Sequence, residues 1–281
     1  MLGHNVTVTI GDDSDPRTDD RIDTGLDARI DEVASLLLDA RRVAVLTGAG
    51  ISTDSGIPDY RGPQGVWTRN PLAEKMSDIR WYVADAEVRK AAWQSRLRSR
   101  AWSAAPNAGH LALVDMQRSG RLHALVTQNV DGLHQESGID PERVVEVHGT
   151  MRWSRCLSCG ERLPMEVVLE RVKAGEEDPA CLGCDGMLKS DTISFGESLV
   201  PEVIERALRV GGECDVLVAV GSTLSVTPVN SMVPIARNSG ARVVIVNGGP
   251  TEMDPLAHVL LRGDISDVLG RLVERAGFRV G

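Results

Sequence analysis

The sequence predicts an α/β fold in which a doubly wound, parallel, Rossmann-like sheet carries a second, smaller domain formed by two insertions. Five short apolar runs each stop at glycine or polar residues, as buried parallel strands do where they end at a ligand crevice. Segments with helical periodicity lie between the runs and supply the crossovers that parallel strands require. Two pairs of closely spaced cysteines mark one insertion as a metal-binding segment.

The elements of the sheet follow one another regularly along the chain. Apolar residues at helical spacing predict a helix over 25–40, and the first strand, 43–46, ends at a glycine-rich turn. The carboxyl ends of parallel strands share one edge of a sheet, so the strand ends are expected to meet at one site. Further strands are expected at 125–126, 144–147, 216–220 and 243–246, and crossover helices at 107–119 and 201–210.

Two insertions, 62–103 and 153–189, interrupt the sheet and are expected to form the smaller zinc-binding and helical domain. Five of the nine aromatic residues lie in the first insertion, which predicts a local core or an apolar lid. We favour the core, because tryptophan is more often a packing residue than a ligand contact. The five are Trp67, Trp81, Tyr82, Trp93 and Trp102. The main domain then comprises 26–61, 104–152 and 190–281, after an acidic leader, 1–25, that is expected to lack fixed structure.

The composition excludes several classes of protein. Hydrophobic residues make up 42% of the 281, enough for a large core, which excludes fibrous and disordered proteins. The formal net charge is −9, but residues 1–32 carry nine acids against three arginines, so the remainder is near −3 and predicts no specific nucleic-acid binding. No apolar run is long enough to span a membrane, and residues 1–10 lack the pattern of a secretion signal. We therefore expect a cytoplasmic protein.

Four of the five cysteines, Cys156, Cys159, Cys181 and Cys184, form two CxxC knuckles with 21 residues between them. Four thiolates complete the tetrahedral coordination of a structural zinc ion and leave no open position for catalysis. Two disulfides or a redox dithiol are the alternatives, and a reducing compartment disfavours disulfides. We predict one structural zinc ion per chain. Cys214 lies in an apolar neighbourhood and is interpreted as a buried packing residue.

Glycine and histidine residues mark the expected crevice. Gly48-Ala49-Gly50 would let backbone N–H groups approach a pyrophosphate, although such glycine pairs are often only tight turns. The polar stretch 51–62 is too long for a turn and favours cofactor binding. His148 follows an apolar strand, where a histidine can act as general base or can cap backbone groups. The sequence does not decide between structural and functional roles for His110 and His134.

Across roughly residues 26–275, a series of short segments resembles, in the same order, those of the sirtuins, which are NAD-dependent protein-lysine deacylases. The loop GIPDYRGPQGVWT is most similar to the bacterial-type branch whose loop ends in GVWT. The matching segments are GAGISTDSGIPDYRG (48–62), PNAGH (106–110), TQNVDGLH (127–134), HG (148–149), the two CxxC knuckles, SFGE (194–197), GSTLSVTP (221–228), VNGG (246–249) and GDI (263–265).

The resemblance implies that NAD is the co-substrate and that three residues are catalytic. His148 would be the base, Asn129 would face the nicotinamide ribose, and Asp131 would hold the nicotinamide carboxamide. Gly48, Ala49 and Gly50 are implied to hold the pyrophosphate. The other implied NAD contacts are Ser52, Ile57, Pro58, Asp59, Tyr60, Arg61, Trp67, Gln128, Val130, Gly221, Ser222, Thr223, Asn247, Gly248, Gly249 and Ile265.

The implied reaction transfers an acyl group from lysine to ADP-ribose and releases nicotinamide. The acyl-lysine protein or peptide would lie as an added β-strand between segments near 194–199 and 222–226. A mono-ADP-ribosyltransferase on the same fold and a noncatalytic nucleotide-sensing zinc module are the alternatives. Two positions depart from the family pattern: Tyr60 stands where many members have Phe, and Ser222-Thr223 reverses the common order. Both keep size or hydrogen-bonding capacity.

Trp93 and Arg96 predict the choice of acyl group. Sirtuins that prefer negatively charged acyl groups resemble one another in placing Tyr and Arg three residues apart here, where the Arg pairs with the acyl carboxylate. The corresponding pair here is Trp93 and Arg96, and Trp93 lacks the hydroxyl of that Tyr. The alternative is that Arg96, which shares its segment with four other basic residues, is one member of a solvated basic face. We therefore predict deacetylation over desuccinylation.

Overall fold

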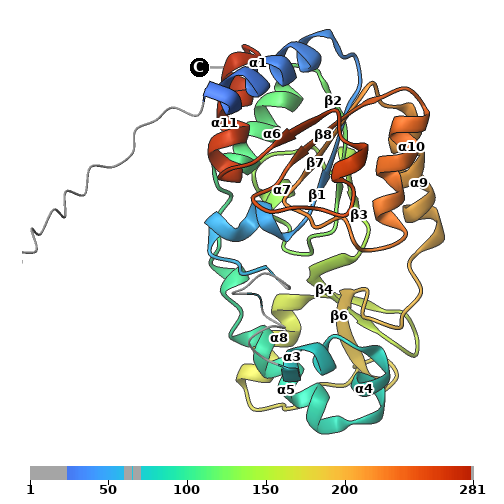
Figure 1. Cartoon of the computed structure of the whole chain (residues 1–281). Coiled ribbons are helices and arrows are strands. Elements are labelled where there is room, and N and C mark those ends of the chain that lie inside the picture. Colours follow the sequence, from blue (N-terminus) through green and yellow to red (C-terminus); the bar gives the residue numbers. More distant parts are fainter. Residues whose placement is uncertain (1–23, 60–64, 66–70, 280–281) are drawn as a thin grey trace, which may run out of the picture.

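The computed structural model describes residues 24–59, 65 and 71–279. Its main sheet has six parallel strands in the order β3-β2-β1-β7-β8-β9 (Figure 1). The chain runs outward from β1 to β3, returns beside β1 as β7 and then builds the other edge, so the predicted doubly wound sheet is confirmed. The strands are β1 Val43–Thr47, β2 Leu122–Thr127, β3 Val144–Glu146, β7 Val216–Val220, β8 Arg242–Val246 and β9 Val259–Leu261.

Helices cover both faces of this sheet (Figure 1). Strand β1 is buried on both sides, because two groups of helices cover the two faces of the sheet. Val43 and Val45 pack in one buried cluster with the first group, and Ala44 and Leu46 pack in a second cluster with the second group. The first group comprises α1 Thr24–Asp39, α6 Ala108–Arg118 and α11 Ile265–Arg275, and the second comprises α9 Pro201–Glu213 and α10 Met232–Asn238. Cys214 lies in the second cluster, buried as predicted.

Most sheet elements match the predicted ones, and one was missed. Strand β9 escaped the sequence analysis because it is only three residues long, and its strand character comes from pairing with β8. Shorter helical elements connect the rest: η1 Ala49–Ser55, α7 Leu133–Glu136, η3 Pro141–Arg143, η4 Val229–Ser231 and η5 Asp254–Leu256. None of the helices in the described part of the chain is both long and apolar enough to cross a bilayer.

The two insertions pack together below the main sheet in Figure 1. The cysteine-bearing insertion and its flanks form a three-stranded antiparallel sheet in the order β5-β4-β6, with helix α8 beside it. Trp93 of α5 is buried in one cluster with Leu169 of α8 and Leu188 of β6. The elements are α3 Pro71–Met76, α4 Ile79–Ala84, α5 Ala86–Leu97, η2 Arg100–Trp102, β4 Gly149–Cys156, β5 Arg162–Pro164, α8 Met165–Lys173 and β6 Leu188–Thr192.

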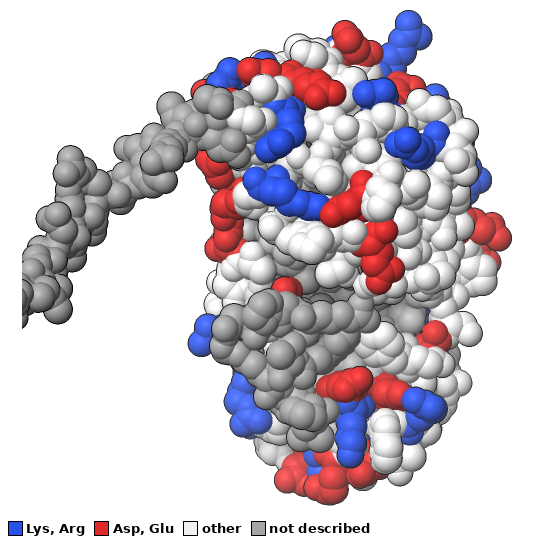
Figure 2. Space-filling model, in the orientation of Figure 1, with Lys and Arg blue, Asp and Glu red and all other residues white. Residues whose placement is uncertain are grey.

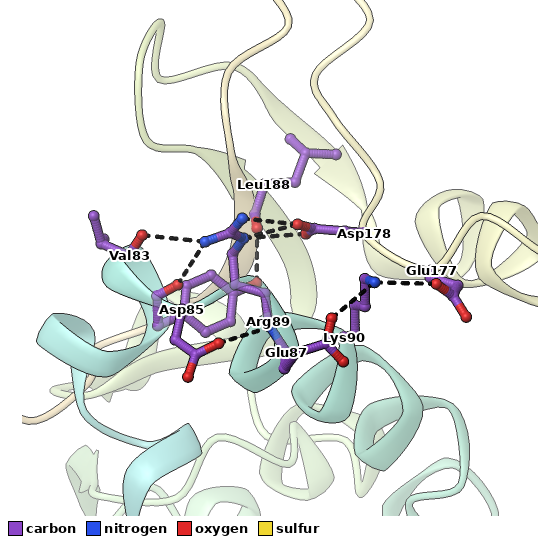
Figure 3. Close-up of polar contacts among 9 residues, drawn as sticks. Val83, Asp85, Glu87, Arg89, Lys90, Glu177, Asp178 and Leu188 are labelled. Atoms are coloured by element: carbon purple, nitrogen blue, oxygen red, sulfur yellow. Dashed lines mark hydrogen bonds and ion pairs between the residues drawn. The ribbon is translucent and has the colours of Figure 1, made fainter.

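Polar contacts also join the two insertions (Figure 3). Arg89 of α5 pairs with Asp178 at 2.9 Å, and the neighbouring Lys90 pairs with Glu177 at 3.3 Å. The buried hydroxyl of Tyr82 donates to the carbonyl oxygen of Leu188 at 2.8 Å, and burial raises the pKa of Tyr82 to about 12. These contacts support the proposal that the insertions form one small domain, although the boundaries given above stay a prediction.

Candidate functional site

Two glycine turns interlock at the point where the strand order reverses, between β1 and β7. The N–H of Gly50 donates to the carbonyl oxygen of Gly221 at 2.8 Å. A Cβ on Gly50 would lie 2.8 Å from the Cα of Gly221, and Gly221 itself has φ +63°. Only glycine fits such a close approach of two backbones. In doubly wound sheets this reversal point is where nucleotide ligands bind.

A cavity of about 780 Å³ opens at this edge of the sheet. It extends from the glycine turns to Asn247 and Ile265 on one side and to residues 192–197 on the other. The predicted residues that line it are Gly48, Ala49, Gly50, Asp59, Gln128, Asn129, Val130, His148, Gly221, Ser222, Thr223, Asn247, Gly248, Gly249 and Ile265. One cavity therefore joins segments that lie far apart in the sequence.

Not every predicted contact lines the cavity. Ser52, Ile57, Pro58 and Asp131 do not, and Tyr60, Arg61 and Trp67 lie outside the described residues. Several lining residues were also missed by the sequence analysis. These are Thr53, Met76, Ser77, Thr192, Ile193, Thr227, Pro250, Gly263 and Asp264. No motif marks Met76, Ser77 or Thr192, because only the packing of the insertions against the sheet brings them here.

Asn129, which lines the cavity, and Asp131, which does not, belong to one buried polar network. The Ser52 hydroxyl donates to the Asp131 carboxylate at 2.8 Å and accepts from the Asn129 amide at 3.1 Å. The other carboxylate oxygen of Asp131 accepts from the N–H of Leu133 at 2.9 Å. Ser52 therefore orients the side chains of Asn129 and Asp131, since a buried polar group in a satisfied network has little freedom to rotate.

His148 lines the cavity, in the short connection between β3 and β4. Its Nδ1 lies 3.1 Å from the carbonyl oxygen of Gln128. A carbonyl only accepts, so Nδ1 carries the proton and Nε2 is left with a free lone pair. Burial lowers the pKa of His148, and the Gln128 carbonyl partly opposes this shift. The imidazole is therefore neutral at pH 7 and has the tautomer of a general base.

His110 and His134 form a buried pair behind Asp131. Their ring centroids are 5.0 Å apart, and His134 Nε2 lies 2.9 Å from the Thr47 hydroxyl. Burial lowers the pKa of His110 to about 4 and that of His134 to about 3, so both are uncharged at neutral pH. Neither residue lines the cavity, and the structure gives both of them a structural place.

Arg96 occupies a different place from the solvated basic face suggested by its neighbours in sequence. Its guanidinium lies over the rings of Trp93 and Tyr82, 5.2 and 5.7 Å from their centroids, and it lines the cavity. Its Nη1 is buried without a hydrogen-bond partner among the described residues. Burial lowers the pKa of Arg96. The solvated-face interpretation is therefore wrong, because α5 turns Arg96 inward between aromatic rings.

The aromatic residues of the first insertion are mostly packing residues, as we favoured. Trp93 and Tyr82 are fully buried, and the Trp102 indole N–H donates to the Arg96 carbonyl oxygen at 2.7 Å. Trp81 differs, with 47% of its surface exposed.

Cys156, Cys159, Cys181 and Cys184 meet in one cluster, with all four sulfur atoms within 4.8 Å of one another. The closest sulfur pairs are Cys156–Cys184 at 3.5 Å and Cys159–Cys181 at 3.7 Å. Tetrahedral zinc–thiolate bonds place sulfur atoms about 3.8 Å apart, so this donor set fits zinc. These separations are far too long for a disulfide bond, and all four cysteines are free.

Comparison with known proteins identifies the family of this chain. Residues 48–228 match the model of the Sir2 family. NAD-dependent protein deacetylase 2 of Streptomyces coelicolor is 48% identical over 84% of this chain and 98% of its own length. NAD-dependent protein deacetylase 1 of Bradyrhizobium diazoefficiens is 38% identical over 90% of this chain and 98% of its own.

Solved structures give the same result. A Sir2 protein with a deacetylated p53 peptide and 3′-O-acetyl ADP-ribose has a TM-score of 0.79, at 30% identity over 87% of this chain and 97% of its own. A structure described as the basis for the mechanism and regulation of Sir2 enzymes has a TM-score of 0.81, at 33% identity over 89% and 98%. The resemblance stated from the sequence motifs is confirmed, and this chain belongs to the Sir2 family, the sirtuins.

Proposed function

We propose that this protein is an NAD-dependent protein-lysine deacetylase, which transfers the acyl group from lysine to ADP-ribose and releases nicotinamide. The observation that carries the proposal is the position of His148, a neutral histidine with a free Nε2 in a cavity that also contains the interlocked glycine turns. Relatives of this chain at up to 48% identity, with nearly full coverage, are named as NAD-dependent protein deacetylases.

The cavity fits NAD by its shape and by its donor groups. Gly48, Ala49 and Gly50 line the cavity and would lie against the pyrophosphate. The N–H groups of Gly48 and Gly50 already donate to the carbonyl oxygens of Val220 and Gly221, so these glycines would serve by letting the backbones approach closely. Asn247 and Ile265 would line the adenosine half. When bound, NAD supplies an electrophilic ribose carbon and the nicotinamide leaving group. Asn129 would face the ribose and Asp131 the carboxamide, both held by Ser52.

Proton transfer is the task of His148. Its Nε2 would accept the proton of a ribose hydroxyl as that oxygen attacks the acyl carbon, and the Gln128 carbonyl would stabilise the imidazolium through Nδ1–H. The acyl oxygen would first displace nicotinamide from the ribose carbon. The acyl carbon–nitrogen bond would then break as the amine leaves with the proton that His148 has taken, and water would supply the atoms that complete acetyl-ADP-ribose. The cysteine cluster would hold one structural zinc ion and take no part in these steps, because four thiolates fill its coordination sphere.

The acyl-lysine peptide would enter as an added β-strand between residues 194–199 and 222–226. Ser194, Phe195 and Leu199 line one side of the cavity, and Ser222 and Val226 line the other. A strand added in this way is recognised through its backbone, which permits many target sequences. We propose a cytoplasmic location and expect no specific nucleic-acid partner, because the chain after residue 32 has a formal net charge near −3. Acidic and basic residues are interspersed on the face seen in Figure 2.

Incubation with NAD and an acetyl-lysine peptide tests the proposal. We expect equal amounts of nicotinamide, free-lysine peptide and acetyl-ADP-ribose, measured by mass spectrometry. A peptide or protein that gains ADP-ribose while its acetyl-lysine remains intact would instead indicate an ADP-ribosyltransferase. NAD binding without nicotinamide release would indicate the noncatalytic alternative.

The inward position of Arg96 favours a second class of substrate, acyl groups that carry a carboxylate. An unpartnered guanidinium beside a cavity gains a charge-assisted hydrogen bond when a carboxylate enters. Trp93 offers no hydroxyl to share that carboxylate, so we keep acetyl as the preferred group.

The Arg96→Met variant tests the role of this guanidinium. We expect kcat/KM for a succinyl peptide to fall about tenfold or more, because one charge-assisted hydrogen bond contributes about 1.5–3 kcal/mol. The value for the acetyl version of the same peptide should change less than about threefold, and Arg98→Met, an exposed change at the end of the same helix, should affect neither. A wild-type preference for succinyl would overturn the acetyl prediction. A succinyl rate that survives in Arg96→Met would remove Arg96 from the acyl site.

A further inference from the structure

A largely buried ion pair lies at the wall of the cavity on its peptide side, with one partner, Glu197, lining the cavity. The side chain of Lys189, in β6, is only 4% exposed, and its Nζ lies 2.9 Å from a carboxylate oxygen of Glu197, which is 21% exposed. The same Nζ donates to the carbonyl oxygens of Ser190 and Thr192. One ammonium group therefore joins the end of a strand to the loop that follows it.

Glu197, at the end of this loop, also contacts the beginning of the loop. The carboxylate oxygen that pairs with Lys189 also accepts the N–H of Ser194 at 2.6 Å. Residues 192–197 thus form a short arch, fastened at both ends by the pair, and all six residues line the cavity. We call residues 192–197 the arch.

The backbone of the arch contacts two other parts of the site. The N–H of Ile193 donates to the carbonyl oxygen of His148 at 2.8 Å. The N–H of Phe195 donates to the carbonyl oxygen of Ser77 at 2.8 Å, and its carbonyl accepts from Ile79 at 3.0 Å. The arch therefore connects the general base to the first insertion, and a shift of the arch would change the opening between them.

The charges around the arch need this pair for balance. Burial lowers the pKa of Lys189 and Arg96 lowers it further, whereas Glu197 and, to a smaller extent, Asp191 oppose these effects. Without Glu197, the buried Lys189 ammonium would lose its paired carboxylate. Without Lys189, the Glu197 carboxylate and the carbonyls of Ser190 and Thr192 would lose a common donor. Removal of one partner of a buried pair is strongly unfavourable, whereas loss of both is tolerated better.

From these contacts we infer that Lys189 and Glu197 are positioning residues, which hold the arch in the conformation that receives the acyl-lysine peptide. The inference rests on the proposed function of the cavity. The pair touches neither His148 nor the glycine turns, so its effect should be on peptide binding, with chemistry and NAD binding left largely intact.

The test compares Lys189→Met, Glu197→Gln, the double variant Lys189→Met/Glu197→Gln and the conservative Lys189→Arg. For Lys189→Met, we expect KM for an acetyl-lysine peptide at saturating NAD to rise about tenfold or more, and kcat and the Kd of NAD to change less than about threefold. Glu197→Gln should act in the same direction but less, because the amide oxygen can still accept from Ser194. The double variant should lose less than the product of the single effects, and Lys189→Arg should stay within about threefold of wild type.

Two further measurements separate positioning from plain stability. Hydrogen exchange at the amide of Ser194 should accelerate in Glu197→Gln under conditions where the rest of the protein stays protected. Lys173→Met removes an exposed ion pair with Glu170 and should change neither exchange nor KM. If folded Lys189→Met and Glu197→Gln keep wild-type peptide KM while their melting temperature falls, the pair is only structural and the inference is wrong. Absence of deacylation in the wild type itself would instead overturn the proposed function. Should Lys189→Met fail to fold, Glu197→Gln and Lys189→Arg still decide between these results.

Discussion

His148→Ala is expected to lower kcat/KM for deacetylation by about 10²- to 10⁴-fold, the range over which a general base contributes. NAD should still bind with a Kd within about threefold of wild type, because the glycine turns that line the cofactor half of the cavity do not contact His148. The measurements are steady-state rates with an acetyl-lysine peptide and calorimetric titration with NAD. His123→Ala is the matched control, because His123 is partly exposed on β2, where it pairs with Glu213 at 3.8 Å.

The pH dependence gives an independent check. Burial lowers the pKa of His148 from its usual 6.5, so the unprotonated, active form dominates at neutral pH. We expect kcat/KM to fall as pH drops through this lowered pKa, and His148→Ala should lose that acidic limb. Turnover near wild type in the variant, or an unchanged acidic limb, would contradict the role of His148 as the base.

The sequence was sufficient to predict those parts of the site that follow directly from strands. The turn after β1, the turn after β7 and His148 all stand where an apolar run stops, and strand pairing alone brings them to one edge. The knuckles were equally predictable, because two residues between thiols suit one tetrahedral metal ion.

The parts that the sequence could not predict depend on packing between distant segments. Lys189 is a lysine in a polar stretch, and nothing local shows that its ammonium is buried against Glu197. Arg96 belongs to a helix rich in basic residues, and only the contact with Tyr82 and Trp93 shows that it faces inward. Ser52 resembles any loop serine until Asn129 and Asp131 are seen on either side of its hydroxyl. Each of these roles depends on neighbours that no local sequence pattern identifies.

Removal of the metal should have the second largest effect, although no step of the reaction uses zinc. Cys156 and Cys181 are buried in one cluster with Trp93, Leu169 and Leu188. The metal would therefore hold the two CxxC segments against the core of the proposed small domain. Metal binding contributes directly to folding in such sites, with apparent free energies of about 10–16 kcal/mol in small zinc domains. We expect about one zinc ion per chain by elemental analysis. Chelation or Cys156→Ala should unfold this domain.

The loss of activity after metal removal should be indirect. It should begin with a change in structure at the peptide side of the cavity. Cys156 pairs with Leu188 in the small sheet, and Lys189 is the next residue of β6, so unfolding there releases the ion pair that holds residues 192–197. Chelated protein should therefore lose deacetylation by about tenfold or more while it keeps NAD binding, because the six-stranded sheet has its own core. Added zinc should restore both melting temperature and rate in wild type.

Cys214→Ala, a change at a buried cysteine remote from the knuckles, is the control and should leave the zinc content unaltered. A metal-free preparation with full activity and an unchanged melting temperature would show that the cluster does not need zinc to support the arch.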